Sequence, residues 1–108
     1  MKVLKFGGSS VGSAETIDQV VDIVRRTYEG GPCAVVLSAM QGTTDALIEA
    51  GGSAARGDDG YIEILSNIGD RHVATICELF TDVDHFAITD FVETTVKDLA
   101  DLCEGVRL

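Results

Sequence analysis

The chain is poor in basic residues, with eight Lys and Arg against eighteen Asp and Glu and a formal net charge of −10 at pH 7. Proteins that bind nucleic acid contact phosphates through clustered Lys and Arg, so we expect no nucleic-acid partner. No apolar run approaches the ~20 residues that cross a membrane, and we expect no membrane association. The N-terminus leads directly into an apolar segment with no secretory signal, which favours a cytoplasmic protein.

Cysteine and histidine are also scarce. Cys33, Cys77 and Cys103 are odd in number, far apart and without C-x-x-C spacing, a pattern that favours neither a disulfide framework nor a zinc site. We predict that they are small core residues. His72 is expected to pack on a helix and His85 to be exposed, and neither belongs to a cluster that suggests a metal site.

Repeats, low-complexity tracts and proline-rich linkers are absent, and the single proline, Pro32, precedes a predicted strand. These features favour one domain, or part of one, across residues 1–108. Apolar periodicity predicts helices over about 14–28 and 60–80 and a last helix with Asp84 as its N-cap. The stretch Gly51–Asp59 is predicted to be a loop.

A glycine pair joins a short apolar strand to the first helix in the segment Lys5–Gly12. Gly7 and Gly8 carry no side chain, so an anion can come within hydrogen-bonding reach of the main-chain N–H groups. Lys5 adds a positive charge, and a helix beginning near Ser13 would direct its unpaired N–H groups at the same place. The segment fits neither G-x-G-x-x-G nor G-x-x-x-x-G-K-S/T, so we expect a phosphate site of another kind.

A second strand is predicted at Cys33–Leu37, and a loop rich in small and hydroxyl-bearing residues, Ser38–Asp45, follows it. A strand, a helix and a second strand form a βαβ crossover, which makes the two strands parallel. Both loops then lie at the carboxyl ends of the strands, where open α/β sheets bind ligands. We therefore expect the two loops to line one crevice.

These two segments resemble the N-terminal part of the aspartokinases, within the amino acid kinase family. Lys5–Val11 is similar to the K-F-G-G-S/T-S-V signature, and Val36–Asp45 is similar to V-L-S-A-x-x-G-x-T-D/N. Gly69–His72 and Leu102–Val106 resemble later family segments more loosely. The resemblance implies an α/β fold, part of the three-layer αβα sandwich of the carbamate kinase-like proteins, with two parallel strands and several helices in this chain.

The resemblance also implies an activity, the ATP-dependent phosphorylation of L-aspartate to 4-phospho-L-aspartate in lysine, threonine and methionine biosynthesis. ATP would bind as MgATP, and no residue of the chain is assigned to a metal. Lys5 would be catalytic, by neutralising charge on the transferred phosphoryl group. The implied ATP phosphate-binding residues are Lys5, Phe6, Gly7, Gly8 and Ser9, and the implied aspartate-binding residues are Ser38 and Thr44.

The chain is shorter than a complete aspartokinase, so we expect a truncated catalytic domain that is inactive alone. Two strands make a sheet with open edges, which favours self-association or a homo-oligomer. The parent protein could also carry regulatory domains or a fused homoserine dehydrogenase, and the sequence of residues 1–108 does not decide between these arrangements. The alternatives are another amino acid kinase, such as an acetylglutamate or uridylate kinase, and a short non-catalytic module that binds a metabolite or pairs with a kinase chain.

Overall fold

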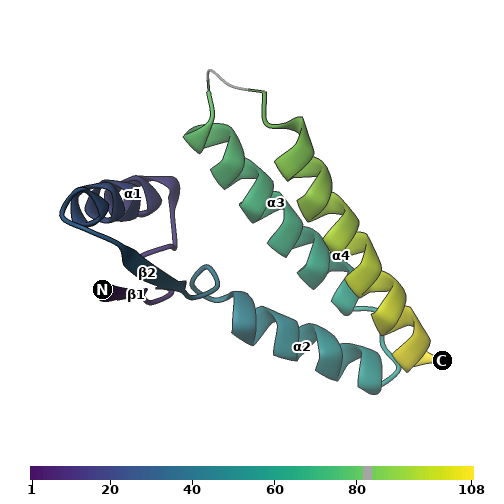
Figure 1. Ribbon diagram of the computed structural model, residues 1–108. Coiled ribbons are helices and arrows are strands. Elements are labelled where there is room, and N and C mark those ends of the chain that lie inside the picture. The colour runs from purple at the N-terminus through teal and green to yellow at the C-terminus, as the bar shows by residue number, and fades with distance from the viewer. Residues whose placement is uncertain (82–83) are drawn as a thin grey trace. The chain divides into compact units, whose positions relative to one another are not determined.

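The computed structural model describes residues 1–81 and 84–108 and contains two parallel strands and four helices (Figure 1). The predicted α/β class is therefore confirmed. The chain divides into two compact units, which we call the strand unit, Met1–Gly42, and the helical unit, Thr43–Leu108. The elements are β1 (Lys2–Phe6), α1 (Ala14–Glu29), β2 (Cys33–Leu37), α2 (Thr43–Ala55), α3 (Tyr61–Leu79) and α4 (Phe86–Arg107).

The strand unit is a βαβ crossover, as the sequence predicts. β1 pairs with β2 in parallel, from Lys2 opposite Cys33 to Phe6 opposite Leu37, and α1 connects them. Val20 of α1 is buried, and it lines a shallow apolar hollow together with Val35 and Leu37 of β2. The apolar stripe of α1 therefore covers one face of the sheet.

The opposite face of this sheet is bare within the strand unit. Side chains alternate between faces along a strand, and in β1 Leu4 and Phe6 are half-buried while Val3 and Lys5 are exposed. Val3 is 66% exposed, and Val36, which pairs with Lys5, is 50% exposed. Lys5 thus lies on an uncovered face, on the side of the sheet away from α1.

Helix α1 begins where the sequence predicts, because a capping box holds its first turn. The hydroxyl of Ser13 accepts a hydrogen bond from the Thr16 backbone N–H at 3.3 Å, and the Thr16 hydroxyl accepts one from the Ser13 N–H at 3.2 Å. Each bond satisfies an N–H group that has no partner within the helix. The capping box fixes the point at which the glycine-rich loop ends.

The helical unit packs α2, α3 and α4 against one another. Its core consists of Ala50 and Ala54 of α2 with Tyr61 and Leu65 of α3, all at most 4% exposed. Partly buried residues of α4 pack against this cluster. The helices approach closely at Gly69, where an added Cβ would lie 3.2 Å from Cγ2 of Val96. Small residues at these contacts allow the close packing.

The predicted loop over Gly51–Asp59 is wrong in its first half, because α2 continues through Gly51 and Gly52 to Ala55. A glycine disfavours a helix by about 1 kcal/mol relative to alanine. Ala50 and Ala54 are each 1% exposed, so their tertiary packing outweighs the low helix propensity of the glycine pair. Only the short connection after Ala55 remains non-helical.

That connection is held by the side chain of Asp58. Asp58 accepts hydrogen bonds from the Ser53 hydroxyl and from the Gly60 backbone N–H. The Ser53 oxygen in turn accepts a bond from the Tyr61 N–H at 3.0 Å, in the first turn of α3. The Ser53 hydrogen bond, followed by that of Gly60, lowers the pKa of Asp58 below its ordinary value.

Other local predictions are only partly correct. α4 begins at Phe86, and the Asp84 carboxylate accepts its backbone N–H at 3.0 Å, although His85 occupies the N-cap position. His85 is half-buried, with Nδ1 3.2 Å from the Thr89 hydroxyl, and the predicted exposure is wrong. The prediction that the cysteines are core residues fails for Cys77, which is exposed, whereas Cys33 and Cys103 are partly buried.

Candidate functional site

The glycine-rich loop and the loop after β2 lie against each other in the strand unit. A Cβ added at Gly8 would lie 3.3 Å from both the Ala39 carbonyl oxygen and Cα of Gln41. The Ser38 backbone N–H donates to the Phe6 carbonyl at 3.1 Å, which continues the pairing of the strands into the loops. The two loops therefore meet at the carboxyl ends of β1 and β2, and Gly8 allows their close approach.

Gly7 differs from Gly8 in its surroundings. A Cβ added at Gly7 would have no atom within 4 Å, and the backbone φ of Gly7 is not positive. Its carbonyl accepts a hydrogen bond from the Ser10 N–H at 3.0 Å, so the turn is closed locally. Neither packing nor backbone conformation requires glycine at this position. The main chain at Gly7 is open to the approach of another molecule.

Lys5 is an exposed cation one residue before the end of β1. Within the described part of the chain it forms none of the ion pairs, which involve other residues. The strand unit as a whole is neutral, since four basic residues balance four acidic ones between Met1 and Gly42. The Lys5 ammonium group can therefore neutralise an anion that binds near the end of its strand.

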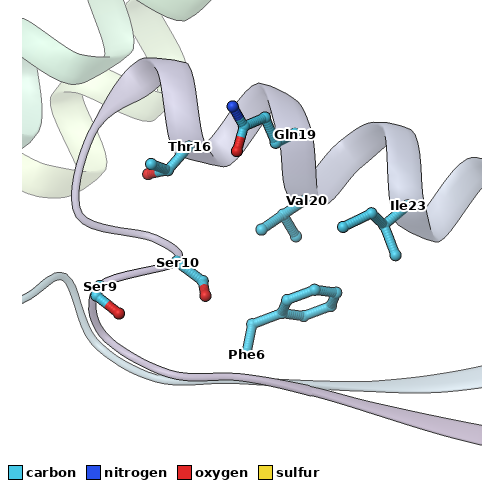
Figure 2. A pocket seen from close by; sticks show the side chains of 7 residues that line it. All are labelled: Phe6, Ser9, Ser10, Thr16, Gln19, Val20 and Ile23. Carbon is cyan, nitrogen blue, oxygen red and sulfur yellow. The ribbon is translucent and has the colours of Figure 1, made fainter.

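A hollow of ≈ 240 Å³ lies beside the glycine-rich loop on the α1 side of the sheet (Figure 2). Its lining residues are Phe6, Ser9, Ser10, Thr16, Gln19, Val20 and Ile23. Figure 2 shows the Phe6 ring directed toward Val20 and Ile23 of α1. The Phe6 side chain thus packs toward α1, while Lys5 lies on the opposite face of the sheet. Of the predicted phosphate-binding residues, Phe6 can offer only its main chain, whose carbonyl already accepts the Ser38 N–H.

The two predicted aspartate-binding residues belong to different units. Ser38 is exposed directly after β2 and belongs to the strand unit with the glycine-rich loop. Thr44 is exposed in the first turn of α2, in the helical unit. The structure therefore brings Ser38 together with Gly7, Gly8 and Ser9, and it describes Thr44 within its own unit.

Sequence reasoning missed the role of Gly42, which ends the loop after β2. Its φ is +86°, in the left-handed region that side chains rarely adopt, and α2 begins at the next residue. The available signal was the glycine itself, directly before a helical pattern.

Among the described residues, no group of His, Cys, Asp or Glu could hold a metal ion. None of the helices in that part of the chain is long and apolar enough to cross a membrane.

The fold and the loops define an α/β protein with an open glycine-rich loop at the carboxyl end of its first strand. In a comparison with known proteins, the model of the amino acid kinase family matches residues 1–79. The chain belongs to the amino acid kinase family.

Individual relatives carry aspartokinase names. The chain is 38% identical to aspartokinase 1, chloroplastic, of Arabidopsis thaliana, over 98% of this chain and 18% of that protein. It is 34% identical to the chloroplastic bifunctional aspartokinase/homoserine dehydrogenase 1 of Zea mays, over 97% of this chain and 11% of that protein. Identity to an aspartate kinase of Pseudomonas fluorescens is 54% over 48 residues, 44% of this chain and 12% of the relative. The chain spans less than a fifth of the length of these relatives.

Proposed function

We propose that residues 1–108 form the N-terminal part of an aspartate kinase catalytic domain, which binds the phosphates of ATP and one side of L-aspartate. The observation that carries the proposal is the open main chain at Gly7, two residues after the exposed cation of Lys5, which takes part in none of the ion pairs among the described residues. The names of the relatives support aspartate as the phosphoryl acceptor. The complete reaction would transfer the γ-phosphoryl group of MgATP to the side-chain carboxylate of aspartate, forming 4-phospho-L-aspartate and ADP.

Phosphoryl transfer depends on positioning and on fixed positive charge, because the transition state spreads negative charge over the equatorial oxygens. In this proposal the Lys5 ammonium group neutralises that charge, and the main chain at Gly7 and Gly8 and the Ser9 hydroxyl donate hydrogen bonds to phosphate oxygens. Gly8 has a second role, since its lack of a side chain allows the loop after β2 to approach closely. Magnesium would bind to the phosphates of ATP, and we assign it no ligand in this chain.

The aspartate substrate would be contacted by the hydroxyl groups of Ser38 and Thr44. Both side chains are exposed. A hydroxyl can donate to a carboxylate and accept from an ammonium group, so it suits an amino acid ligand. A role in the biosynthesis of lysine, threonine and methionine remains a prediction. A cytoplasmic location is a prediction as well, and the plant relatives carry the word chloroplastic in their names.

We expect the 108-residue chain on its own to show no kinase activity, because we propose that it is only part of the catalytic domain.

The two-stranded sheet of the strand unit is open to association. Its bare face includes Val3 and Val36, and neither strand edge is paired further in this sheet. Such edges favour association with another chain or with a second copy. The alternative is a non-catalytic module that binds a metabolite or pairs with a kinase chain.

The deciding experiment is an assay of the polypeptide that the native gene produces. It should be incubated with MgATP and L-aspartate, with ADP release and hydroxylamine-trapped aspartyl phosphate measured together. We expect both products in equal amounts, and none when aspartate is replaced by N-acetylglutamate or UMP. Activity with one of those acceptors would assign another amino acid kinase, and a native 11.4 kDa product that binds ligands without turnover would assign the non-catalytic module.

A further inference from the structure

Gly42 ends the loop after β2 and lies directly before α2. Its backbone φ is +86°, in the left-handed region that glycine adopts freely and that most other residues avoid. In the described part of the chain, positive φ angles occur at glycines alone, namely Gly31, Gly42 and Gly57. The local backbone at position 42 therefore has a requirement that few side chains meet.

The two neighbours of Gly42 are each held by contacts of their own. Gln41 lies against the glycine-rich loop, since a Cβ added at Gly8 would be 3.3 Å from Cα of Gln41 and 3.5 Å from its backbone nitrogen. On the other side, Thr43 is the first residue of α2 and is only 8% exposed. A left-handed residue between two held neighbours cannot relax unless one of them moves. A side chain that rejects this conformation would thus disturb the loop or the first turn of α2.

Thr44 lies in that first turn, two residues after Gly42, and its side chain is exposed. In the proposed function its hydroxyl contacts aspartate. A hydrogen bond from a hydroxyl group spans only about 2.5–3.0 Å between its oxygen atoms, so a small displacement of the turn is enough to lose it. The contact of Thr44 with a substrate therefore depends on the backbone conformation at Gly42.

We propose that Gly42 is a positioning residue for the phosphoryl acceptor, because its left-handed backbone fixes the first turn of α2 and with it the Thr44 hydroxyl. The inference rests on the proposed function, in which Thr44 contacts aspartate. Gly42 has no side chain for the chemistry itself and acts through Thr44. A change of its backbone conformation should therefore weaken the use of aspartate and leave the use of ATP nearly unchanged.

The test compares Gly42→Ala with Gly42→Asn in the complete enzyme, by steady-state kinetics and urea unfolding. Asn tolerates the left-handed conformation, whereas Ala does not. We expect Gly42→Ala to raise the KM for aspartate about five- to tenfold, as loss of one hydroxyl contact would, with little change in the KM for ATP. In Gly42→Asn the KM for aspartate should stay within about twofold of the wild-type value.

Gly57→Ala is the matched control. Gly57 has a φ of +79° in the connection between α2 and α3, and an added Cβ there would meet no atom within 4 Å. Alanine therefore brings a similar backbone strain at a residue that has no part in the proposed site. The urea midpoint of Gly57→Ala should fall about as much as that of Gly42→Ala, while the KM for both substrates stays at the wild-type value. A rise of the KM for aspartate in both variants would reduce the role of Gly42 to stability and overturn the proposal.

Two further kinetic results would overturn it, an unchanged KM for aspartate in folded Gly42→Ala and an equal rise in Gly42→Asn. If Gly42→Ala does not fold, Gly42→Gln replaces it, because Gln has the amide group of Asn without the same tolerance for the left-handed region. Failure of both to fold would overturn the proposal as well, since glycine would then serve the fold alone.

Thr44→Val separates this inference from the proposed function. A raised KM for aspartate in Thr44→Val, together with an unchanged one in Gly42→Ala, rejects the positioning role and keeps the aspartate contact. An unchanged KM for aspartate in Thr44→Val rejects the contact itself, and the positioning role with it.

Discussion

The two units of the chain differ in net charge as well as in secondary structure. The strand unit has four acidic and four basic residues, whereas the helical unit has fourteen acidic and four basic ones. The entire net charge of −10 therefore belongs to the helical unit. Within the strand unit itself, no excess of negative charge opposes an anion at Lys5. An acidic chain can thus carry a neutral unit suited to phosphate.

The largest effect that would sharpen this comparison is expected from Lys5→Ala in the complete enzyme. Lys5 is exposed and outside the ion pairs of the structure, so stability should change little. If Lys5 contacts the transferred phosphoryl group, kcat and kcat/KM should fall together by roughly 100- to 1000-fold. Steady-state kinetics checks this, with Lys2→Ala on the same strand as the control. A change confined to KM would contradict the assigned role.

The two glycines of the loop provide a matched pair. Gly8→Ala places a Cβ 3.3 Å from the Ala39 carbonyl and should destabilise the fold by about 1–3 kcal/mol. Gly7→Ala meets no atom within 4 Å, so its free energy of unfolding should stay within about 0.5 kcal/mol while the KM for ATP rises. Urea unfolding and ATP kinetics of both variants separate the two roles. Equal stability loss in both would show that Gly7 is also a packing residue.

A smaller effect is expected from Thr44→Val, whose residue belongs to the helical unit, unlike Lys5 and the two glycines of the loop. Loss of one hydroxyl contact should raise the KM for aspartate about five- to tenfold and leave that for ATP nearly unchanged. Thr94→Val, at an exposed threonine of α4, serves as the control. A parallel loss of affinity for both substrates would indicate that Thr44 acts through the structure of α2.

Within the helical unit, two helical glycines should respond differently to replacement by alanine. Gly105 of α4 has no atom within 4 Å of an added Cβ, so Gly105→Ala should stabilise the unit by up to about 1 kcal/mol through helix propensity. In Gly69→Ala the new Cβ would lie 3.2 Å from Val96, which cancels or reverses that gain. Thermal unfolding of both variants checks the difference. Equal stabilisation would mean that α3 and α4 are not in close contact at Gly69.

The smallest effect concerns the turn held by Asp58, whose pKa is lowered by its hydrogen bonds to Ser53 and Gly60. A lowered folded-state pKa means that ionised Asp58 stabilises the fold above its ordinary pKa of 3.8, and that this contribution is lost as pH falls through the lowered value. Asp58→Asn should therefore be less stable than wild type at pH 7, and this difference should shrink as the pH falls below 3.8. Asp59→Asn is the control. A stability difference that persists at acid pH would exclude ionisation as the cause.

Local signals in the sequence predicted much of the fold. Apolar runs and capping residues placed both strands, α1 and α3, because these elements follow from periodicity and from short-range hydrogen bonds. The prediction failed where tertiary contacts decide the outcome, as at Gly51 and Gly52 inside α2 and at exposed Cys77. From the sequence alone, Gly51 and Gly52 predict a loop. The packing of Ala50 and Ala54 in the core has to be known before a helix is predicted there.

The sequence by itself determined the family and the order of the elements, since the motif around Lys5 and Gly7 and the loop after β2 are contiguous in the chain. Only the tertiary structure decided which glycine packs and which is open, and that Lys5 and the Phe6 ring lie on opposite faces of the sheet. The physical reason is that adjacent residues of the same type differ only in their neighbours, and folding brings those neighbours from distant parts of the chain.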